Sequence, residues 1–114
     1  MAINLSTLVN QASSLQLAKA WINFNGTTNT TRASYNVSSV TKNATGDYTI
    51  NFTTAMTDAN YSASILACYT ANSIPVPYFN NTTPPTTTTF RFILQSLAQQ
   101  VYDQNYVMVN VFGN

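Results

Sequence analysis

The residue types on which most enzyme active sites depend are missing or scarce in this sequence. It contains no histidine, one cysteine and three glycines. Histidine is the commonest general base and metal ligand, and a phosphate-binding loop needs clustered glycines. The three carboxylates, Asp47, Asp58 and Asp103, lie far apart in the sequence, whereas a glycosidase needs two carboxyl groups beside one bond. These absences predict a protein that is not an enzyme and that binds no metal or cofactor.

Charged residues are also scarce, at 6% of the chain, against about 25% in ordinary soluble domains. The formal net charge is +1, and the four cations are scattered along the sequence. Nucleic-acid binding needs a stripe of cations to neutralise phosphates, so this class of function is excluded. Thr, Asn and Ser supply the polarity instead, as in residues 27–31. An uncharged surface gives little repulsion between molecules and suits a protein held in an assembly.

Long apolar segments are absent as well. No apolar run approaches the roughly 20 residues of a membrane-spanning helix, so we expect no membrane insertion. The N-terminus lacks the basic segment of a secretory signal. The single cysteine, Cys68, has no partner for an internal disulfide. Its apolar neighbours in residues 64–69 predict a buried, unreactive thiol.

Alternation of apolar and polar residues with a period of two predicts a β-sheet protein. Residues 32–40 and 47–54 alternate in this way, and the turn-rich segment 41–46 joins them as a hairpin. Further strands are expected at residues 18–24, 61–70, 90–96 and 106–112. About six strands at such close spacing predict an all-β fold over residues 18–114, an antiparallel β-sandwich of jelly-roll-like type.

Aromatic residues at alternating strand positions are expected in the core. They are Phe24, Tyr35, Tyr48, Phe52, Phe90 and Phe92. The later strands carry apolar residues on both faces, and such strands must be covered on both. We therefore predict an interface with other copies or a partner protein, formed by Leu66, Ile93, Met108 and Phe112. The alternative is an ordinary two-layer core with a few stray apolar side chains.

Residues 1–17 differ from the rest of the chain. Leu5, Leu8, Ala12 and Leu15 follow helical spacing and would form a seam of about two heptads. A helix this short is marginal in water. If helical, the segment would need partners, either as a bundle of copies or as a peg in a neighbouring protein. A loosely ordered arm is the other interpretation, because Asn, Ser and Thr lower its helix propensity.

All four prolines lie within residues 71–89, which are predicted to form a long surface loop. Tyr78 and Phe79 lie in this loop beside Asn80 and Asn81. Exposed aromatic rings next to amide side chains can stack on sugar rings and bond their hydroxyls, so these four residues are candidate ligand-binding residues. Alternatively, the loop folds back and Phe79 closes the end of the domain.

Part of the chain resembles a known module in order and spacing. The matching segments are residues 18–27 (AKAWINFNGT), 32–41 (RASYNVSSVT), 46–56 (GDYTINFTTAM) and 58–61 (DANY). They closely resemble a module that recurs at the C-terminal end of tail fibres of tailed bacteriophages. The resemblance covers residues 18–61 and implies a trimeric, β-rich virion appendage whose distal loops touch the host surface.

The resemblance leads to two main hypotheses and a third. The first is a homotrimeric phage virion protein of tail-fibre type that contacts the host surface, with a host glycan as a possible ligand. Only seventeen residues precede the matching segment, so the second is a capsid decoration, cement or baseplate appendage protein anchored to other virion proteins by residues 1–17. In both cases the protein would be located in the virion, assembled in the bacterial host cytoplasm. The third hypothesis is a free carbohydrate-binding module.

Overall fold

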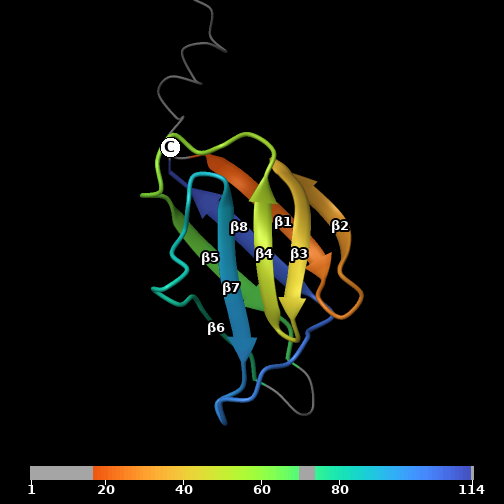
Figure 1. Cartoon of the computed structure of the whole chain (residues 1–114). Coiled ribbons are helices and arrows are strands. Elements are labelled where there is room, and N and C mark those ends of the chain that lie inside the picture. Colours follow the sequence, from red (N-terminus) through yellow and green to blue (C-terminus); the bar gives the residue numbers. More distant parts are fainter. Residues whose placement is uncertain (1–16, 70–73, 114) are drawn as a thin grey trace, which may run out of the picture.

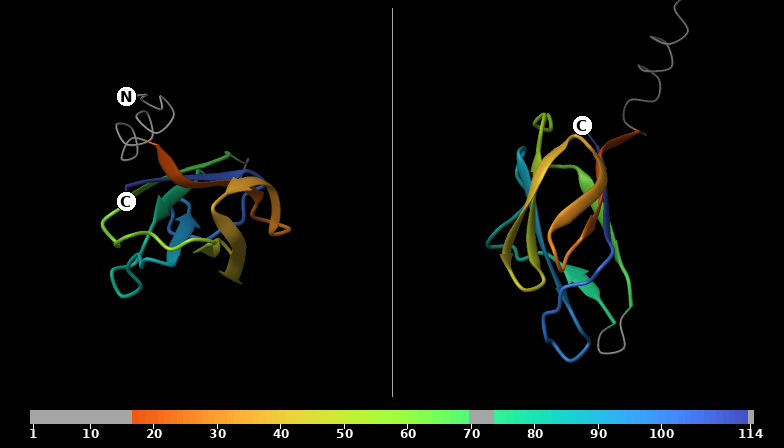
Figure 2. Two further views of the ribbon diagram at one scale, coloured as in Figure 1. Left: turned by 90° about the horizontal axis from the view of Figure 1, so that it is seen from above. Right: turned by 90° about the vertical axis from the view of Figure 1, so that its right-hand side faces the viewer.

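Eight β-strands make up the part of the chain that the computed structural model describes, residues 17–69 and 74–113. They form two antiparallel sheets of four strands, packed as separate layers (Figure 1; Figure 2). The first sheet has the order β2-β1-β8-β5, with the bounds β1 Ala18–Asn25, β2 Thr30–Tyr35, β5 Ser62–Ala67 and β8 Val107–Phe112. The second has the order β3-β4-β7-β6, with the bounds β3 Val37–Ala44, β4 Asp47–Phe52, β6 Val76–Tyr78 and β7 Thr89–Gln95. The described residues contain no helix, so the predicted all-β antiparallel sandwich is confirmed.

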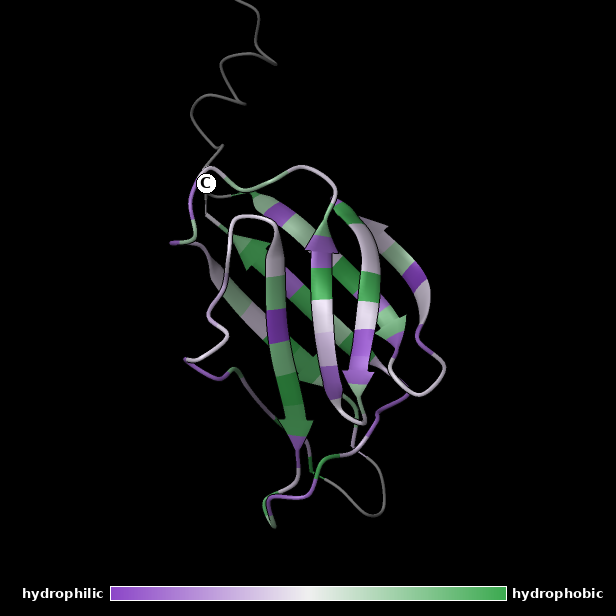
Figure 3. Cartoon of the chain, in the orientation of Figure 1, coloured by the Kyte–Doolittle hydropathy of each residue, from purple (hydrophilic) through white to green (hydrophobic). Residues whose placement is uncertain are grey.

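The core lies between the sheets because apolar residues alternate along the strands. On β4, Tyr48, Ile50 and Phe52 are buried while the residues between them are partly exposed, and on β8 buried residues alternate with exposed ones. Figure 3 shows hydrophilic and hydrophobic residues following one another along β3 and β4. The Tyr48 ring meets Phe24 of the first sheet edge-on, with ring centroids 5.2 Å apart, and lies 5.7 Å from Phe92. Burying one large apolar side chain contributes about 1.5–3 kcal/mol. These rings therefore join the two layers at the centre of the core.

The predicted strand at residues 32–40 is wrong as a single element, because it forms parts of two strands in different sheets. Asn36 separates β2 from β3 and has a φ of 55°, which asparagine adopts more readily than most residues. Its Nδ2 donates to the carbonyl oxygens of Lys19, at 3.0 Å, and Thr54, at 3.1 Å. Its Oδ1 accepts from the Thr54 amide at 2.7 Å. One side chain thus fixes the corner at which the chain crosses between the sheets.

The corner also overturns the expectation that Tyr35 lies in the core. Every residue of β2 is exposed, and the Tyr35 side chain is 57% exposed. The other five aromatic residues predicted for the core are buried: Phe24, Tyr48, Phe52, Phe90 and Phe92.

The remaining predicted strands are confirmed with ends shifted by a few residues. The proline-rich segment also contains a short strand, β6, which pairs with β7 and was predicted as loop. Pro77 is tolerated there because β6 is an edge strand. Of the predicted arm, residues 1–17, only Leu17 is described, and it is exposed.

The carboxylate of Asp103 closes one end of the sandwich. Its Oδ1 accepts hydrogen bonds from the Gly46 amide at 2.8 Å and the Tyr48 hydroxyl at 2.6 Å, and its Oδ2 accepts from Lys42 Nζ at 2.7 Å. Burial would raise the pKa of Asp103, but these three hydrogen bonds outweigh it and hold the pKa below its usual value. The carboxylate therefore ties the loop before β8 to the β3–β4 hairpin.

Candidate functional site

A groove of about 540 Å³ lies where β5 and β6 form the edges of the two sheets. Its β5 wall includes Ile65. The aromatic and proline side chains that line it are Tyr61, Pro77, Tyr78, Phe79, Pro85 and Phe90. Among the described residues, no charged side chain lines this groove. We call it the aromatic groove.

The wall of the aromatic groove is held by Tyr61. Its hydroxyl lies 2.9 Å from the carbonyl oxygen of Thr86 and 3.0 Å from that of Thr89, and donates its hydrogen to them. Burial raises the pKa of Tyr61 to about 12, so the hydroxyl keeps its proton at neutral pH. The Phe90 ring meets Tyr61 edge-on at 6.4 Å and Phe79 at 6.1 Å. The aromatic surface is therefore positioned before any ligand arrives.

The structure brings two of the four predicted ligand-binding residues to this groove. Tyr78 and Phe79 line it and remain 39% and 49% exposed. Phe79 also packs on Phe90, so it both contacts the core and faces solvent. Asn80 and Asn81 are not lining residues. Asn80 Oδ1 instead accepts hydrogen bonds from the amide and hydroxyl of Thr82, at 3.0 and 2.9 Å, which stabilises a turn.

The outward face of the first sheet carries large apolar side chains at neighbouring register positions. Met108 lies opposite Leu66 in the β5–β8 pair, and Trp21 lies opposite Tyr35 in the β1–β2 pair. Leu66 is 69% exposed and Phe112 is 42% exposed. With Tyr106 beside them, these side chains form what we call the apolar face: Trp21, Tyr35, Leu66, Tyr106, Met108 and Phe112.

A shallow hollow of about 360 Å³ lies in the apolar face. Leu66, Ala67, Cys68, Tyr106 and Met108 surround it. Cys68 is half-buried, whereas the sequence predicted a buried residue. The hollow presents almost only apolar atoms, as a surface that receives another protein does.

The predicted interface residues fall into three groups. Leu66, Met108 and Phe112 lie together on the apolar face. Ile93 belongs to β7 in the other sheet, where it lies opposite Asp47 and is half-buried, so it does not share that face. The predicted contacts of the N-terminal arm, Leu5, Leu8 and Leu15, lie outside the described residues.

Sequence reasoning missed Trp21, Tyr35 and Tyr106 as members of the apolar face. Trp21 carried a usable signal, because it alternates with the buried residues Ala20 and Ile22 and must therefore face outward. Tyr35 carried none, because its orientation depends on the Asn36 corner.

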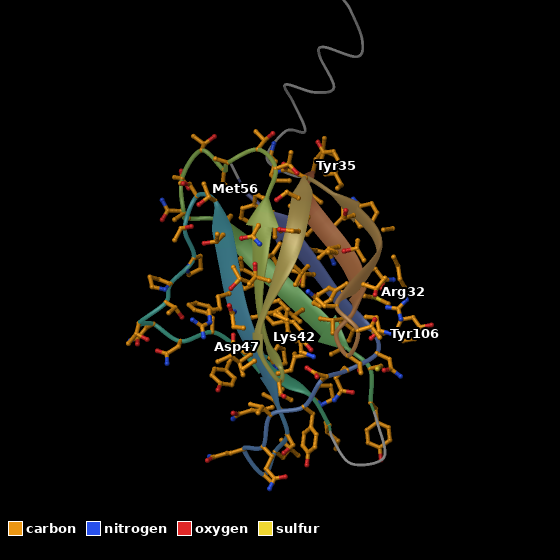
Figure 4. All side chains as sticks on the ribbon, turned by 45° about the vertical axis from the view of Figure 1, so that its right-hand side comes forward. Arg32, Tyr35, Lys42, Asp47, Met56 and Tyr106 are labelled. Atoms are coloured by element: carbon orange, nitrogen blue, oxygen red, sulfur yellow. The ribbon has the colours of Figure 1, made fainter. Side chains whose placement is uncertain are left out.

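The few charges are mostly neutralised within the chain. Arg91 pairs with Asp47 through two hydrogen bonds, of 2.9 and 2.7 Å, which lower the pKa of Asp47. The guanidinium of Arg32 lies 3.8 Å from the centroid of the Tyr106 ring (Figure 4). Its Nη1 donates a hydrogen bond to Asn23 Oδ1 at 3.3 Å. Neither of the two ion pairs among the described residues, Lys42–Asp103 and Arg91–Asp47, includes a residue of the apolar face or of the aromatic groove.

Within the described residues, no three His, Cys, Asp or Glu side chains come close enough together to hold a metal ion. The same residues include no helix with the length and hydrophobicity needed to cross a membrane. Comparisons with the profiles of known protein families, with curated proteins and with solved structures give no match.

Proposed function

We propose that this chain is a structural protein of a tailed-bacteriophage virion, of tail-fibre type, that works as a homotrimer and contacts the host surface. The observation that carries the proposal is the presence of two contact surfaces on one sandwich. The apolar face lies on the outside of the first sheet, and the aromatic groove opens between the sheet edges. The resemblance of residues 18–61 to a tail-fibre module agrees with this division into assembly and recognition.

The apolar face supports self-association. Soluble monomers rarely expose contiguous apolar patches larger than a few hundred Å², and such patches usually mark interfaces. Trp21, Leu66 and Met108 occupy three neighbouring strands of one sheet. The residues opposite Trp21 and Met108 in the β1–β8 pair are Asn110 and Asn23, which are polar but uncharged. Few charges oppose close approach. Arg32, stacked on Tyr106, is the charge that lies against this face, and another copy covers the face at little desolvation cost when the guanidinium stays at the rim of the contact.

The aromatic groove supports recognition of an uncharged ligand. Tyr78 and Phe79 present partly exposed rings beside the hydroxyl-bearing Ser62. Rings of this kind stack on the apolar faces of sugars, while hydroxyl groups bond the sugar hydroxyls. A host-surface saccharide is therefore the ligand that we assign to the groove.

The test is adsorption of particles that carry Tyr78→Ala and Phe79→Ala together. We expect normal particle yield and a loss of adsorption of tenfold or more. The matched control is Tyr69→Ala, because Tyr69 is 68% exposed and does not line the groove. Unchanged adsorption of the double variant would rule out host recognition by the aromatic groove.

Capsid cement or a baseplate appendage is the second candidate, favoured by the nearly uncharged surface and the apolar face. Immunogold labelling of particles separates the two. Label at the fibre tips agrees with the first proposal. Label on the capsid, together with lower heat resistance of particles that lack the protein, would replace it with the cement role.

A further inference from the structure

The two sheets differ in how their edges are protected. In the second sheet, β6 has only three residues and includes Pro77, while β3 carries Lys42 and two breaks in register. Short length, proline, lysine and bulges all discourage pairing with another chain. In the first sheet, β5 has six residues with no charge and no proline. No backbone hydrogen bond within the described residues joins β5 to any strand except β8.

The opposite edge of the first sheet, β2, is more protected than β5, because it has one charge and one break in register, but it has fewer breaks than β3 and no proline. It also has six residues, all exposed. Its one charge, Arg32, is the extra residue at a register shift, and its guanidinium is stacked on Tyr106 of the apolar face. The guanidinium therefore lies over the outward face of the sheet and does not extend from the β2 edge. Figure 4 shows the two side chains next to each other. Figure 1 places β5 and β2 at the two sides of the same sheet.

We infer that β5 of one copy pairs with β2 of the next, head to tail, so that the first sheets join around an axis along the strands. This inference rests on the proposed homotrimer and specifies how it is built. Because the sheet contains four antiparallel strands, its two edge strands run in opposite directions. Rotation about an axis along the strands keeps the direction of every copy, so β5 meets the neighbouring β2 in an antiparallel ladder.

The position of the chain ends favours this arrangement over a twofold pairing of β5 with β5. Ala18 of β1 lies opposite Phe112 of β8, so β1 begins and β8 ends at the same end of the sandwich (Figure 2). A head-to-tail ring gathers three such ends on one side of the assembly, where the seventeen residues that precede β1 in each copy are attached. A twofold pair would send them in opposite directions, which does not suit an appendage attached at one end.

The ring also gives the apolar face an occupant. It turns the outward face of each first sheet toward the axis, so that Trp21, Leu66 and Met108 are covered by their counterparts in the other copies. The added β2 strand extends the β5 wall of the aromatic groove. The groove would then lie at the boundary between two copies, and a ligand in it would contact both.

Disulfide trapping in the full chain tests the pairing. In a Cys68→Ser background, Ser62→Cys or Ser64→Cys on β5 is combined with Ala33→Cys or Tyr35→Cys on β2, giving four double variants. These positions share the outward face, and directly opposite residues in a ladder are close enough for a disulfide. After mild oxidation we expect covalent trimers from at least one double variant and monomers from every single variant on non-reducing gels.

The control pair, Thr41→Cys with Val76→Cys, places cysteines on the two edges of the second sheet and should stay monomeric. Circular dichroism identifies any variant that fails to fold. Such a variant is set aside, and the result is taken from the double variants that do fold. Covalent dimers from Ser64→Cys alone would show twofold pairing and overturn the inference. Trimers in sedimentation that no double variant traps would overturn the edge pairing but keep the homotrimer. Monomers throughout would overturn both.

Discussion

The Tyr48 hydroxyl donates a hydrogen bond to Asp103 across 55 positions of sequence, at 2.6 Å. The same hydroxyl lies 2.9 Å from the carbonyl oxygen of Gly26, at the turn after β1. Through this one oxygen the β4 strand, the loop before β8 and the first turn are held together. Tyr48 is fully buried. If its hydroxyl is removed, water cannot replace the lost hydrogen bonds without opening the core.

We expect Tyr48→Phe to lower the free energy of unfolding by about 1.5–3 kcal/mol, because the charged Asp103 loses one of its donors. Urea denaturation followed by circular dichroism measures this change. Tyr102→Phe is the matched control, since the Tyr102 hydroxyl bonds only the exposed Gln100 side chain at 2.7 Å. Its loss should change the free energy by less than about 0.5 kcal/mol. Equal changes in the free energy of unfolding for the two substitutions would show that the hydrogen bond from Tyr48 to Asp103 adds no more stability than an exposed one.

Acid should unfold the protein through its paired carboxylates. The folded-state pKa values of Asp47 and Asp103 are lowered. Their contribution is therefore present above the unfolded pKa of about 3.9 and is lost as the pH falls through the folded values. With no histidine in the chain, the free energy of unfolding should be nearly flat from about pH 5 to 7 and decline below about pH 4. Urea midpoints across this range measure it, and Asp103→Asn should flatten the acid limb.

Gly46→Ala should destabilise the hairpin between β3 and β4. Gly46 has a φ of 68°, and an added Cβ would lie 2.8 Å from the Leu94 carbonyl oxygen and 2.9 Å from that of Tyr102. The left-handed backbone alone costs a residue with a side chain about 1–2 kcal/mol, and the contacts with two backbone oxygens add to it. Thermal unfolding compares this variant with Thr45→Ala, an exposed substitution in the same turn. A melting temperature for Gly46→Ala that matches the control would contradict the close approach.

Leu66→Ser and Met108→Ser should weaken self-association without unfolding the sandwich, because both side chains point away from the core. We expect the association constant to fall about tenfold or more for each, which corresponds to about 1.4 kcal/mol. Analytical ultracentrifugation measures the mass distribution. Leu97→Ser is the control, since Leu97 is 74% exposed in a loop outside the apolar face. If all three variants associate equally, the apolar face is not the interface.

Local alternation was enough to predict the sandwich and most of its core. Residues 47–52, which form β4, have inward side chains at every second position, and the first sheet covers only that face of the strand. The period of the sequence and the burial of the side chains therefore agree. Residues 32–40 show the limit of this reasoning. Asn36 turns the backbone without interrupting the alternation, so the change of sheet leaves no periodic signal.

The candidate site was less predictable because it depends on which edges meet. Tyr78 and Phe79 stood out as aromatic residues outside the alternating pattern, and they do line a groove. Tyr61 and Pro85 join them only because β5 and β6 end the two sheets on the same side. That proximity belongs to the strand order, which pairs β8 with both β1 and β5, and short-range patterns do not encode it.

Trp21 is the only tryptophan in the chain, and it lies on the apolar face at 38% exposure. Its indole is therefore an intrinsic fluorescent reporter for the surface that we propose for self-association. The emission maximum of a partly solvent-exposed indole moves to shorter wavelength when the surrounding water is excluded. The state of the face can be followed at low protein concentration without any label, and dissociation can be distinguished from unfolding by the circular dichroism of the intact sandwich.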